Sequence, residues 1–478
     1  MSATGTTPFG AGWSGKVLSL KGRFRSEASR TEEPSSGAAT AAAPVTGDVV
    51  SFLTVYLILT LAVPSYLTIT ALGSMGRPST LWALLGLFWW FFERLRRTTT
   101  LNTGSRAVRW ILLLFLAAVL LSYAVSNLQG MPPSESSPAD SGMLRVAGWV
   151  GIALLANDGI ASPDRWLGLI RRLVFISGMA GLLGLAQFLT SQTLLDWVSL
   201  PGFSAEGGHE VSSRGDFIRP SGTATQPLEY AVVLSMALPL SLTLALSDKG
   251  RSLAARWWPA LALTLACIMS GSRSAFIGAA VGVLVLIPTW PSALRIRVLG
   301  AFAVLLGLVY VSVPGIAGTV RGMFQTLGND SSSLSRTESY VVAAEIAVRN
   351  LFFGRGFGTF LPNYRIFDNG YLTALVEVGI IGLALLLLLL SSGVWAALST
   401  AYTRQPAASL SRALGAGLAA AILAGGVLLS FFDGLNFPIS AALLFLAVGL
   451  GGAYRGLARA APDGSGFAQR PDADGNRA

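Results

Sequence analysis

The sequence is poor in the residues that build metal sites and disulfide frameworks. Its 478 residues include one cysteine, Cys267, and one histidine, His209, so a disulfide within the chain, a thiolate metal site and a multi-histidine metal site are excluded. Charge is scarce as well, because Asp, Glu, Lys and Arg make up 12% of the chain, about half of the roughly 25% usual in soluble domains. An ordinary cytosolic or secreted enzyme is therefore excluded.

What the sequence has in excess is apolar surface. Hydrophobic residues make up 52% of the chain, glycine adds 54 residues, and the mean hydropathy is +0.60. The net charge of +10 is compatible with a nucleic-acid partner, but basic residues spread along an apolar chain are better explained as loop arginines that set membrane topology. The composition predicts an all-α integral membrane protein without a nucleic-acid partner.

Apolar runs that approach the thickness of a membrane recur along the chain. A helix needs about 20 apolar residues to span the hydrocarbon core. The runs cover residues 49–72, 78–92, 107–127, 143–160, 169–190, 227–247, 256–271, 273–290, 296–314, 371–398, 412–432 and 435–454. The sequence therefore predicts about 12 transmembrane helices, of which the second and seventh are short.

The basic residues are divided unevenly between the two sides of this predicted bundle. An even number of spans puts both termini on one side, whose segments carry 24 of the 34 Lys and Arg residues, whereas the opposite side carries ten. In membrane proteins the cytoplasmic loops carry the excess of Lys and Arg. We therefore predict a multi-pass protein of the plasma membrane with both termini in the cytoplasm.

Composition divides the chain into three parts. Residues 1–48 are rich in Gly, Ser, Thr, Ala and Pro and carry a basic cluster, which predicts a disordered basic cytoplasmic tail. Residues 49–454 form the predicted polytopic membrane domain. Residues 455–478 predict a second disordered cytoplasmic tail.

A long segment between the ninth and tenth spans, about residues 315–370, is predicted to lie outside the membrane. Loops longer than about 15 residues are usually functional or disordered. Ser335-Arg336-Thr337-Glu338 fits the capping box that begins many helices, which predicts an amphipathic helix over about 336–350 near the outer membrane surface. The alternative is a lid that packs on the bundle and binds no ligand.

Three outer arginines stand beside predicted helix N-termini. Arg219 precedes the span that begins at Pro227. Arg273 follows Ser272, a predicted N-cap, in a break between two apolar runs, and Arg336 opens the predicted outer helix. Helix N-terminal amides and a guanidinium together bind phosphate groups, so the three arginines predict an extracytoplasmic anion site. Two alternatives stay open, namely that Arg273 anchors lipid headgroups and that Arg336 pairs with a nearby carboxylate.

Two acidic residues belong to the tenth span. Asp368 stands at its predicted outer end, and Glu377 follows nine residues later, about 13 Å deeper along a helix. Asp368 is the wetter of the two and therefore the better candidate for a general base. Glu377, as a carboxylate within the membrane, is either functional or a structural hydrogen-bond acceptor for a neighbouring helix. The outer side has no acidic cluster able to hold a divalent ion, so neither a metal nor a cofactor is expected.

Four stretches occur in an order typical of one family of membrane enzymes. They are Arg219–Pro227, Ser270–Ala275, Arg336 with Leu351–Phe360, and Asp368–Gly382. Together they resemble the O-antigen ligase and O-antigen polymerase superfamily of polytopic membrane glycosyltransferases, and the likeness covers about residues 215–450. Phe432–Pro438 is also similar to the corresponding stretch of Gram-positive actinobacterial members.

The resemblance implies a reaction and a set of partners. Members of this family transfer a glycan from undecaprenyl pyrophosphate onto a sugar hydroxyl at the outer face of the plasma membrane, in surface polysaccharide biosynthesis. The expected partners are therefore a polyprenyl-pyrophosphate-linked glycan donor, a glycan or glycolipid acceptor, and membrane lipids.

The resemblance also implies roles for residues. Those implied to bind the donor pyrophosphate are Arg219, Arg273 and Arg336, and those implied to support the site are Glu377, Arg355 and Asp433. Asp368 stands where the ligases of the family carry the histidine that activates the acceptor, and a carboxylate can also accept a hydroxyl proton as the catalytic base. Because of this difference, ligation and polymerisation both stay open.

Two other classes of protein stay open. A secondary transporter would place charged residues at the bilayer midplane, where the sequence offers few besides Glu377. A shape- or division-type peptidoglycan glycosyltransferase also uses an outer-loop aspartate in a multispan bundle, but the arginine set and the Gly-rich stretch argue against it.

Overall fold

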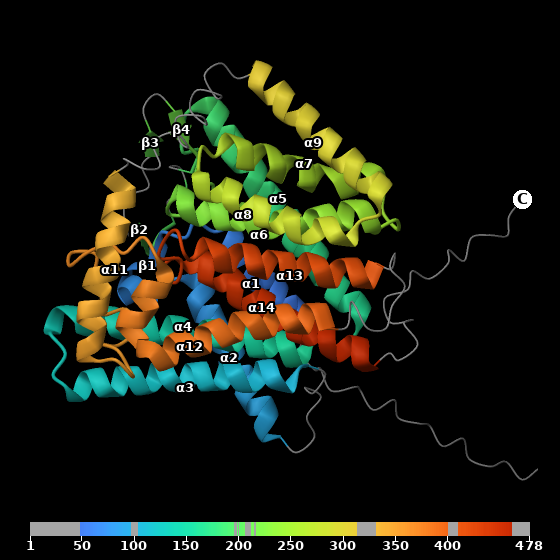
Figure 1. Cartoon of the computed structure of the whole chain (residues 1–478). Helices are drawn as coiled ribbons and strands as arrows, with labels where there is room; N and C mark the ends of the chain where they lie inside the picture. Colours follow the sequence, from blue (N-terminus) through green and yellow to red (C-terminus); the bar gives the residue numbers. More distant parts are fainter. Residues whose placement is uncertain are drawn as a thin grey trace, which may run out of the picture. The chain divides into compact units, whose positions relative to one another are not determined.

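Long helices make up most of the described structure (Figure 1). The computed structural model describes residues 48–96, 104–195, 198, 200–205, 212–214, 217–312, 331–399 and 410–460, all within one unit, Gly47–Ala478. In chain order the helices are α1 (Val49–Leu61), α2 (Pro78–Leu95), α3 (Arg106–Leu128), α4 (Pro133–Gly159), α5 (Pro163–Thr190), α6 (Pro227–Ser247), α7 (Leu253–Met269), α8 (Arg273–Leu286), α9 (Ser292–Ser312), α11 (Ser331–Arg349), α12 (Gly370–Ser399), α13 (Leu410–Leu428) and α14 (Pro438–Ala460).

Two small antiparallel sheets lie in the connections. β1 (Leu67–Ile69) pairs with β2 (Phe203–Ala205), and β3 (Ser212–Arg214) pairs with β4 (Phe217–Arg219). Helix dominates as predicted, whereas these strands were not predicted, because a strand of three residues is too short to show a periodic signal.

A helix lies over each of the twelve predicted apolar runs within the described residues. Seven of them are long and apolar enough to cross a membrane, namely α3, α4, α5, α6, α12, α13 and α14. Three apolar stretches are shorter: α1, α7 and Arg273–Thr289. The helices and their apolarity support a multi-pass membrane protein, and the number of twelve crossings stays a prediction.

Two predicted helix boundaries are wrong near the N-terminus. α1 ends at Leu61 rather than near residue 72, because Pro64 does not continue a helix and the apolar Leu67–Ile69 pairs as a strand instead. α4 begins at Pro133, ten residues before the predicted start at 143. Its first turns are polar, so hydropathy alone does not mark them as helix.

The predicted C-terminal tail is wrong at its start. α14 continues to Ala460, because Arg455 is held against α12: its guanidinium carbon lies 3.3 Å from the centroid of the Trp395 ring, and its Nη1 donates to Ser399 Oγ at 2.9 Å. Residues 461–478 lie outside the described residues, as does the predicted N-terminal tail apart from its last residue.

Ion pairs gather at one end of the helices, which we call the basic end. Asp158, at the end of α4, accepts hydrogen bonds from Arg109 at the start of α3 and from Arg94 at the end of α2, at 2.7 and 3.2 Å. Asp248, directly after α6, accepts from Arg171 near the start of α5 at 2.7 Å. Ends and starts of successive helices therefore meet here, so the helices run in alternating directions.

The first described helix, α1, begins at the basic end, and the last, α14, ends there. Asp48, just before α1, pairs with Arg165 near the start of α5, and Ser105 N, just before α3, donates to Gly452 O in the last turns of α14. This is the arrangement expected for an even number of spans. We call the opposite end, where β1–β4 and α11 lie, the loop end (Figure 1).

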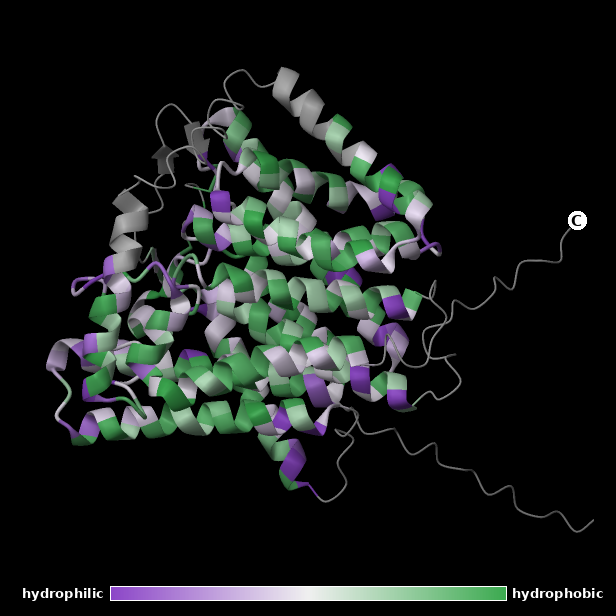
Figure 2. Cartoon of the chain, viewed as in Figure 1, coloured by the Kyte–Doolittle hydropathy of each residue, from purple (hydrophilic) through white to green (hydrophobic). Residues whose placement is uncertain are grey.

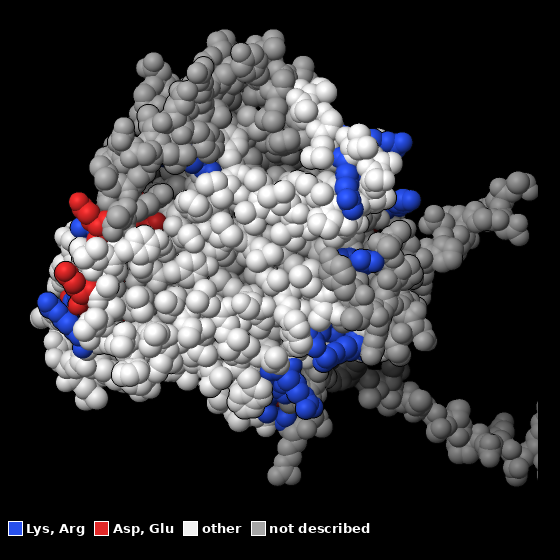
Figure 3. Space-filling view, viewed as in Figure 1, with Lys and Arg blue, Asp and Glu red and all other residues white. Residues whose placement is uncertain are grey.

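The surface between the two ends is apolar. Figure 2 shows hydrophobic residues along the middle of the helices and hydrophilic ones toward their ends. Figure 3 shows most of the Lys and Arg in view at one end, the acidic side chains with some basic ones at the other, and a broad uncharged belt between them. Large apolar side chains are exposed in the interior of the helices, such as Leu120 of α3 at 44% and Leu387 and Leu388 of α12 at 46% and 50%. Water would not favour such a surface, but lipid does.

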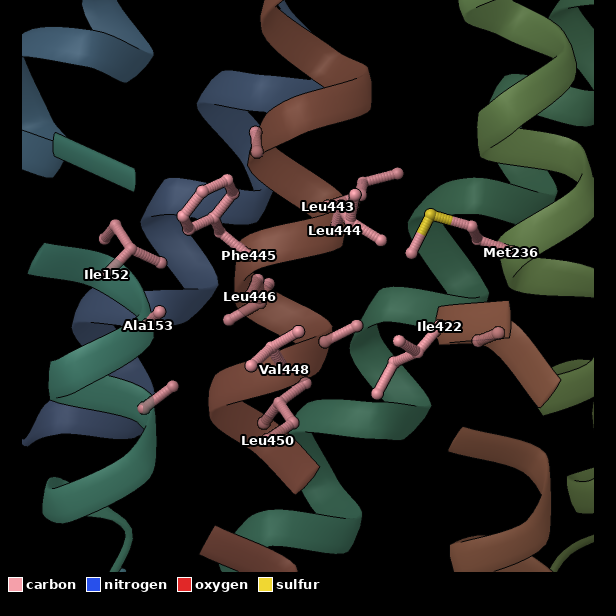
Figure 4. Close-up of a cluster of buried hydrophobic side chains, with 14 of the residues drawn as sticks. Ile152, Ala153, Met236, Ile422, Leu443, Leu444, Phe445, Leu446, Val448 and Leu450 are labelled. Atoms are coloured by element: carbon pink, nitrogen blue, oxygen red, sulfur yellow. The ribbon is translucent and has the colours of Figure 1, made fainter. Parts of the chain in front are cut away.

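The core is centred on α14, in which 94% of an apolar stretch of 18 residues is buried. Figure 4 shows Phe445 directed toward Ile152 of α4 and Leu444 directed toward Met236 of α6. Close approach at the lower half of α14 depends on glycine: a Cβ on Gly449 would lie 2.4 Å from a backbone oxygen of α4. Small residues at membrane helix interfaces allow this contact, so α4 and α14 pack closely.

Candidate functional site

The helix that carries Glu377 and begins two residues after Asp368 is broken. Within α12, Gly379 has φ 68° and ψ −173°, which interrupts the helical backbone. Irregular backbone at membrane depth persists only where its polar groups find partners in the protein. The break therefore needs a second segment that supplies hydrogen bonds.

The Gly-rich segment Leu351–Phe360 supplies these partners. Its Leu351 O accepts from Ile380 N at 2.8 Å, and its Gly356 N donates to Glu377 O, also at 2.8 Å. The approach is so close that a Cβ on Gly354 would lie 2.4 Å from Glu377 O. The Gly-rich stretch and the helix that follows it, both singled out in the sequence, thus form one structural unit.

Glu377 is a hydrogen-bond acceptor in this unit. Its side chain is 1% exposed, and its Oε1 accepts from Phe360 N at 3.2 Å. Its backbone oxygen also accepts from the Ser122 hydroxyl of α3 at 2.9 Å. Glu377 therefore accepts a hydrogen bond, as one of the two expectations had it, but the donor belongs to the Gly-rich segment and not to a neighbouring helix.

Asp368 lies at the loop end, two residues before α12 begins, in the predicted place. It is half-buried and sits between two anchored neighbours. Phe367 is buried and stacks on Phe360 with ring centroids 4.6 Å apart. Asn369 Oδ1 accepts from Tyr371 N at 3.0 Å and so caps the helix. The residues on either side of Asp368 are thus anchored, while Asp368 itself is partly exposed.

A second carboxylate, Asp433, lies beside Asp368 in the connection between α13 and α14. Burial raises the pKa of Asp433 to about 6, and the charge of Asp368 acts in the same direction. Hydrogen bonds from Asn436 and Thr373 and the charge of Arg145 oppose this rise. Asp433 was predicted as a supporting residue, and the structure places it next to the predicted base.

Arg145 was not predicted and is the cation of this cluster. It lies in α4, its Nη1 donates to Asn436 O at 3.1 Å, and its charge acts on both Asp433 and Glu377. Sequence reasoning counted Arg145 only among the ten basic residues of the outer side, because no motif surrounds it. Its position could have indicated a functional role, because it lies near the polar start of an apolar run on the side that is poor in basic residues.

Arg219 ends β4 and is half-buried. The loop after it is fastened to two helices: Gly222 N donates to Gln187 Oε1 of α5 at 2.8 Å, and Thr223 Oγ1 donates to Leu61 O of α1 at 2.7 Å. Pro227 then occupies the first turn of α6, as predicted. The motif is thus a fixed loop at the loop end.

Arg273 is the first residue of α8 and is half-buried. This placement confirms the predicted break between two helices. The predicted capping role of Ser272 is wrong: Ser272 stands at the N-cap position, but its hydroxyl pairs with that of Ser274 at 2.8 Å and makes no cap hydrogen bond. The positive φ of Gly271, 56°, makes the tight turn that brings α7 and α8 together.

Arg336 lies in α11, and the predicted start of that helix is wrong. α11 begins at Ser331 instead of near 336, so Ser335 is inside the helix and Arg336 is not in the first turn. Buried Ala343 and Ala347 lie on the same helix, and its Tyr340 hydroxyl accepts from Asn369 at 3.3 Å.

Arg355 is paired with a buried carboxylate of α4. Its Nη2 donates to Glu135 Oε1 at 2.7 Å, and the Tyr364 hydroxyl donates to the same oxygen at 2.8 Å. The bond to Glu135 raises the pKa of the Tyr364 hydroxyl. These contacts fasten the Gly-rich segment to the start of α4, which fits the supporting role expected of Arg355.

In the described structure Asp433 thus lies within electrostatic reach of Asp368, Glu377 and Arg145. The three predicted donor-binding arginines come from separate segments of the same end: a loop strand, the start of α8, and α11. In the described part of the chain, no group of three or more His, Cys, Asp or Glu residues is placed to hold a metal ion.

One comparison with known proteins matches this region. Residues 258–387 match the family model described as O-antigen ligase. The matched segment contains Arg273, Arg336 and Asp368, and Asp433 lies beyond it. No curated protein matches the chain. The family match confirms the resemblance to the O-antigen ligase and polymerase superfamily that the sequence motifs indicate.

Proposed function

We propose that this protein is a membrane glycosyltransferase that moves a lipid-linked glycan onto a sugar hydroxyl in surface polysaccharide biosynthesis. The observation that carries the proposal is the pair Asp368 and Asp433, which lies at the mouth of the broken helix α12. Most of that helix falls within the segment that matches the O-antigen ligase family. The donor is an undecaprenyl-pyrophosphate-linked glycan, and the loop end faces the outside of the cell.

Asp368 is the catalytic base in this scheme. The acceptor hydroxyl gives its proton to the Asp368 carboxylate while its oxygen attacks the anomeric carbon of the donor sugar. The bond between that carbon and the pyrophosphate oxygen breaks, the electron pair leaves with the pyrophosphate, and the configuration at the carbon is inverted. Half-burial suits this role, because the acceptor can reach the carboxylate while the neighbours on either side hold it still.

Asp433 supports the base through its charge. When both carboxylates are ionised, a proton that arrives from the acceptor relieves the repulsion between them. Arg145, which acts on Asp433 and Glu377, keeps the cluster from carrying too much negative charge near an anionic donor. A cation opposite several carboxylates also fixes their positions.

Arg219, Arg273 and Arg336 receive the charge that develops on the leaving pyrophosphate. Guanidinium groups aimed at developing charge in a site with little water contribute several kcal/mol to transition-state stabilisation. The planar guanidinium also grips two phosphate oxygens at once. With this charge supplied by side chains, the scheme is metal-independent.

A secondary transporter is the second candidate, and one observation favours it. Discontinuous helices beside a buried carboxylate, such as α12 with Glu377 and the break at Gly379, are common at transporter binding sites. Flux of a labelled lipid-linked glycan across vesicles, without a new glycosidic bond, would favour the transporter.

The test of the proposed function is Asp368→Asn, measured as glycan transfer from a lipid-pyrophosphate donor by purified protein in liposomes. We expect the turnover to fall by about 10²–10⁴, because the amide cannot accept the proton. Donor binding should persist, since the arginines hold the pyrophosphate.

The matched control is Asp140→Asn. Asp140 is also a half-buried aspartate at the loop end, but it accepts a hydrogen bond from Tyr123 and lies outside the cluster. We expect it to keep most of the wild-type turnover. Wild-type turnover in Asp368→Asn would remove Asp368 from the mechanism.

A further inference from the structure

A small basic pocket lies at the basic end, between α5, α6 and α7. Its volume is about 120 Å³, enough for a phosphate-sized group, since one water needs roughly 10–15 Å³ by the same kind of measure. The charged residues of its lining are Arg171, Arg251, Arg256 and Asp248. Three arginines against one aspartate give the lining a net charge of +2.

One ion pair in the pocket is complete, which leaves the other two arginines as its positive groups. Arg171 makes two parallel bonds to Asp248, Nε to Oδ2 at 2.8 Å and Nη2 to Oδ1 at 2.7 Å. These bonds occupy both oxygens of the one carboxylate in the lining. The charges of Arg251 and Arg256 are therefore not balanced by a carboxylate of the pocket.

Arg256 has a donor that the protein leaves unused. Its Nη1 donates to the backbone oxygen of Asp248 at 3.3 Å, but its Nε–H is buried and has no hydrogen-bond partner among the described residues. Buried donors are normally satisfied. An unused guanidinium donor in a positively charged pocket indicates that an anion completes the site.

The other wall of the pocket is apolar and continues onto the lipid-facing surface. Trp258 and Pro259 of α7 line it together with Phe175 of α5, which is 52% exposed and meets Trp258 edge to face at 5.4 Å. Further along α7, Leu261 is 52% exposed. An anion with a hydrocarbon chain can use both walls at once, whereas inorganic phosphate can use only the basic one.

We propose that this pocket binds the phosphate group of an anionic phospholipid, whose acyl chain lies along Phe175 and Trp258. Basic pockets between helices at a membrane boundary are suited to anionic headgroups, and each Lys or Arg strengthens the attraction. The pocket lies at the opposite end from the Asp368 cluster, so this proposal does not depend on the proposed transfer reaction.

The test uses the full-length protein in detergent, titrated with short-chain phosphatidylglycerol or phosphatidylcholine and read by native mass spectrometry. We expect phosphatidylglycerol to bind more tightly than phosphatidylcholine. Arg251→Gln and Arg256→Gln should each lower its affinity about fivefold, from the usual contribution of one cation near a membrane surface. Arg251 is exposed, so its variant leaves the fold intact should the Arg256 variant not fold.

The matched control removes two positive charges from the same end, outside the pocket. Arg297→Gln with Arg459→Gln, both exposed, should leave the affinity unchanged, and an equal loss in this control would overturn the proposal in favour of unspecific attraction.

Inorganic phosphate is the second probe. Phe175→Ala should weaken phosphatidylglycerol but not phosphate. Equal binding of phosphate and phosphatidylglycerol would show a site for soluble anions instead.

Discussion

Replacing Gly379 by alanine is expected to separate the Gly-rich segment from α12. The φ of 68° and ψ of −173° belong to a region used almost only by glycine, and a side chain there costs on the order of 1–3 kcal/mol. The new Cβ would also lie 2.3 Å from Phe352 O. The backbone must shift to avoid this contact, which removes the bond from Ile380 N to Leu351 O at about 1 kcal/mol. The expected loss is therefore about 2–4 kcal/mol.

The assay for Gly379→Ala combines denaturant unfolding of the purified protein with glycan transfer. Gly168→Ala is the matched control, because a Cβ at this position in α5 meets no atom within 4 Å. It should be neutral or stabilise the fold by about 0.5–1 kcal/mol, as alanine does in a helix interior. Wild-type stability and transfer in Gly379→Ala would refute the idea that the break holds the site together.

The remaining predictions concern topology, donor binding and pH. On a Cys267→Ala background, an impermeant reagent applied to intact cells should label a cysteine at the exposed loop-end Asn363 and not one at the exposed basic-end Lys249; the reverse pattern would refute the orientation. Arg273→Lys should lower transfer nearly as much as Arg273→Ala, because lysine lacks the planar fork; full activity would make Arg273 a headgroup anchor. Since the pKa of Asp433 is raised to about 6, its charge is present above pH 6 and lost below it, so the transfer rate should fall as the pH drops through 6. Asp433→Asn should lack this step in its pH profile.

Hydropathy predicts the helices where apolar residues and helix coincide. The span at 227–247 has the observed bounds of α6, because Pro227 marks its first turn and the charged Asp248 directly follows its end. Prediction fails where the two do not coincide. The polar first turns of α4 are helical without being apolar, and the apolar Leu67–Ile69 is strand because a distant loop segment pairs with it.

The residues of the candidate site could be predicted only when they lie in a recognisable stretch. Asp368 stands in such a stretch and has the predicted place at the mouth of α12. Arg145 and Glu135 do not lie in such a stretch. They belong to the site because Arg145 contacts the connection before α14 and Glu135 contacts the Gly-rich segment. Those contacts join residues more than 200 positions apart, and a single sequence carries no signal for them.

In the matched segment, the residues that form the junction with α12 have a different role from Asp368. The glycines at 354 and 379 allow two backbones to meet where any Cβ would clash, and Glu377 accepts a hydrogen bond from the same junction. This junction satisfies a helix break that lipid alone would not tolerate. The junction is closed by the protein itself and buries Glu377, whereas Asp368, at the mouth of α12, is partly exposed. This is why we propose Asp368, the residue in which this chain differs from the ligases that it resembles, as the proton acceptor.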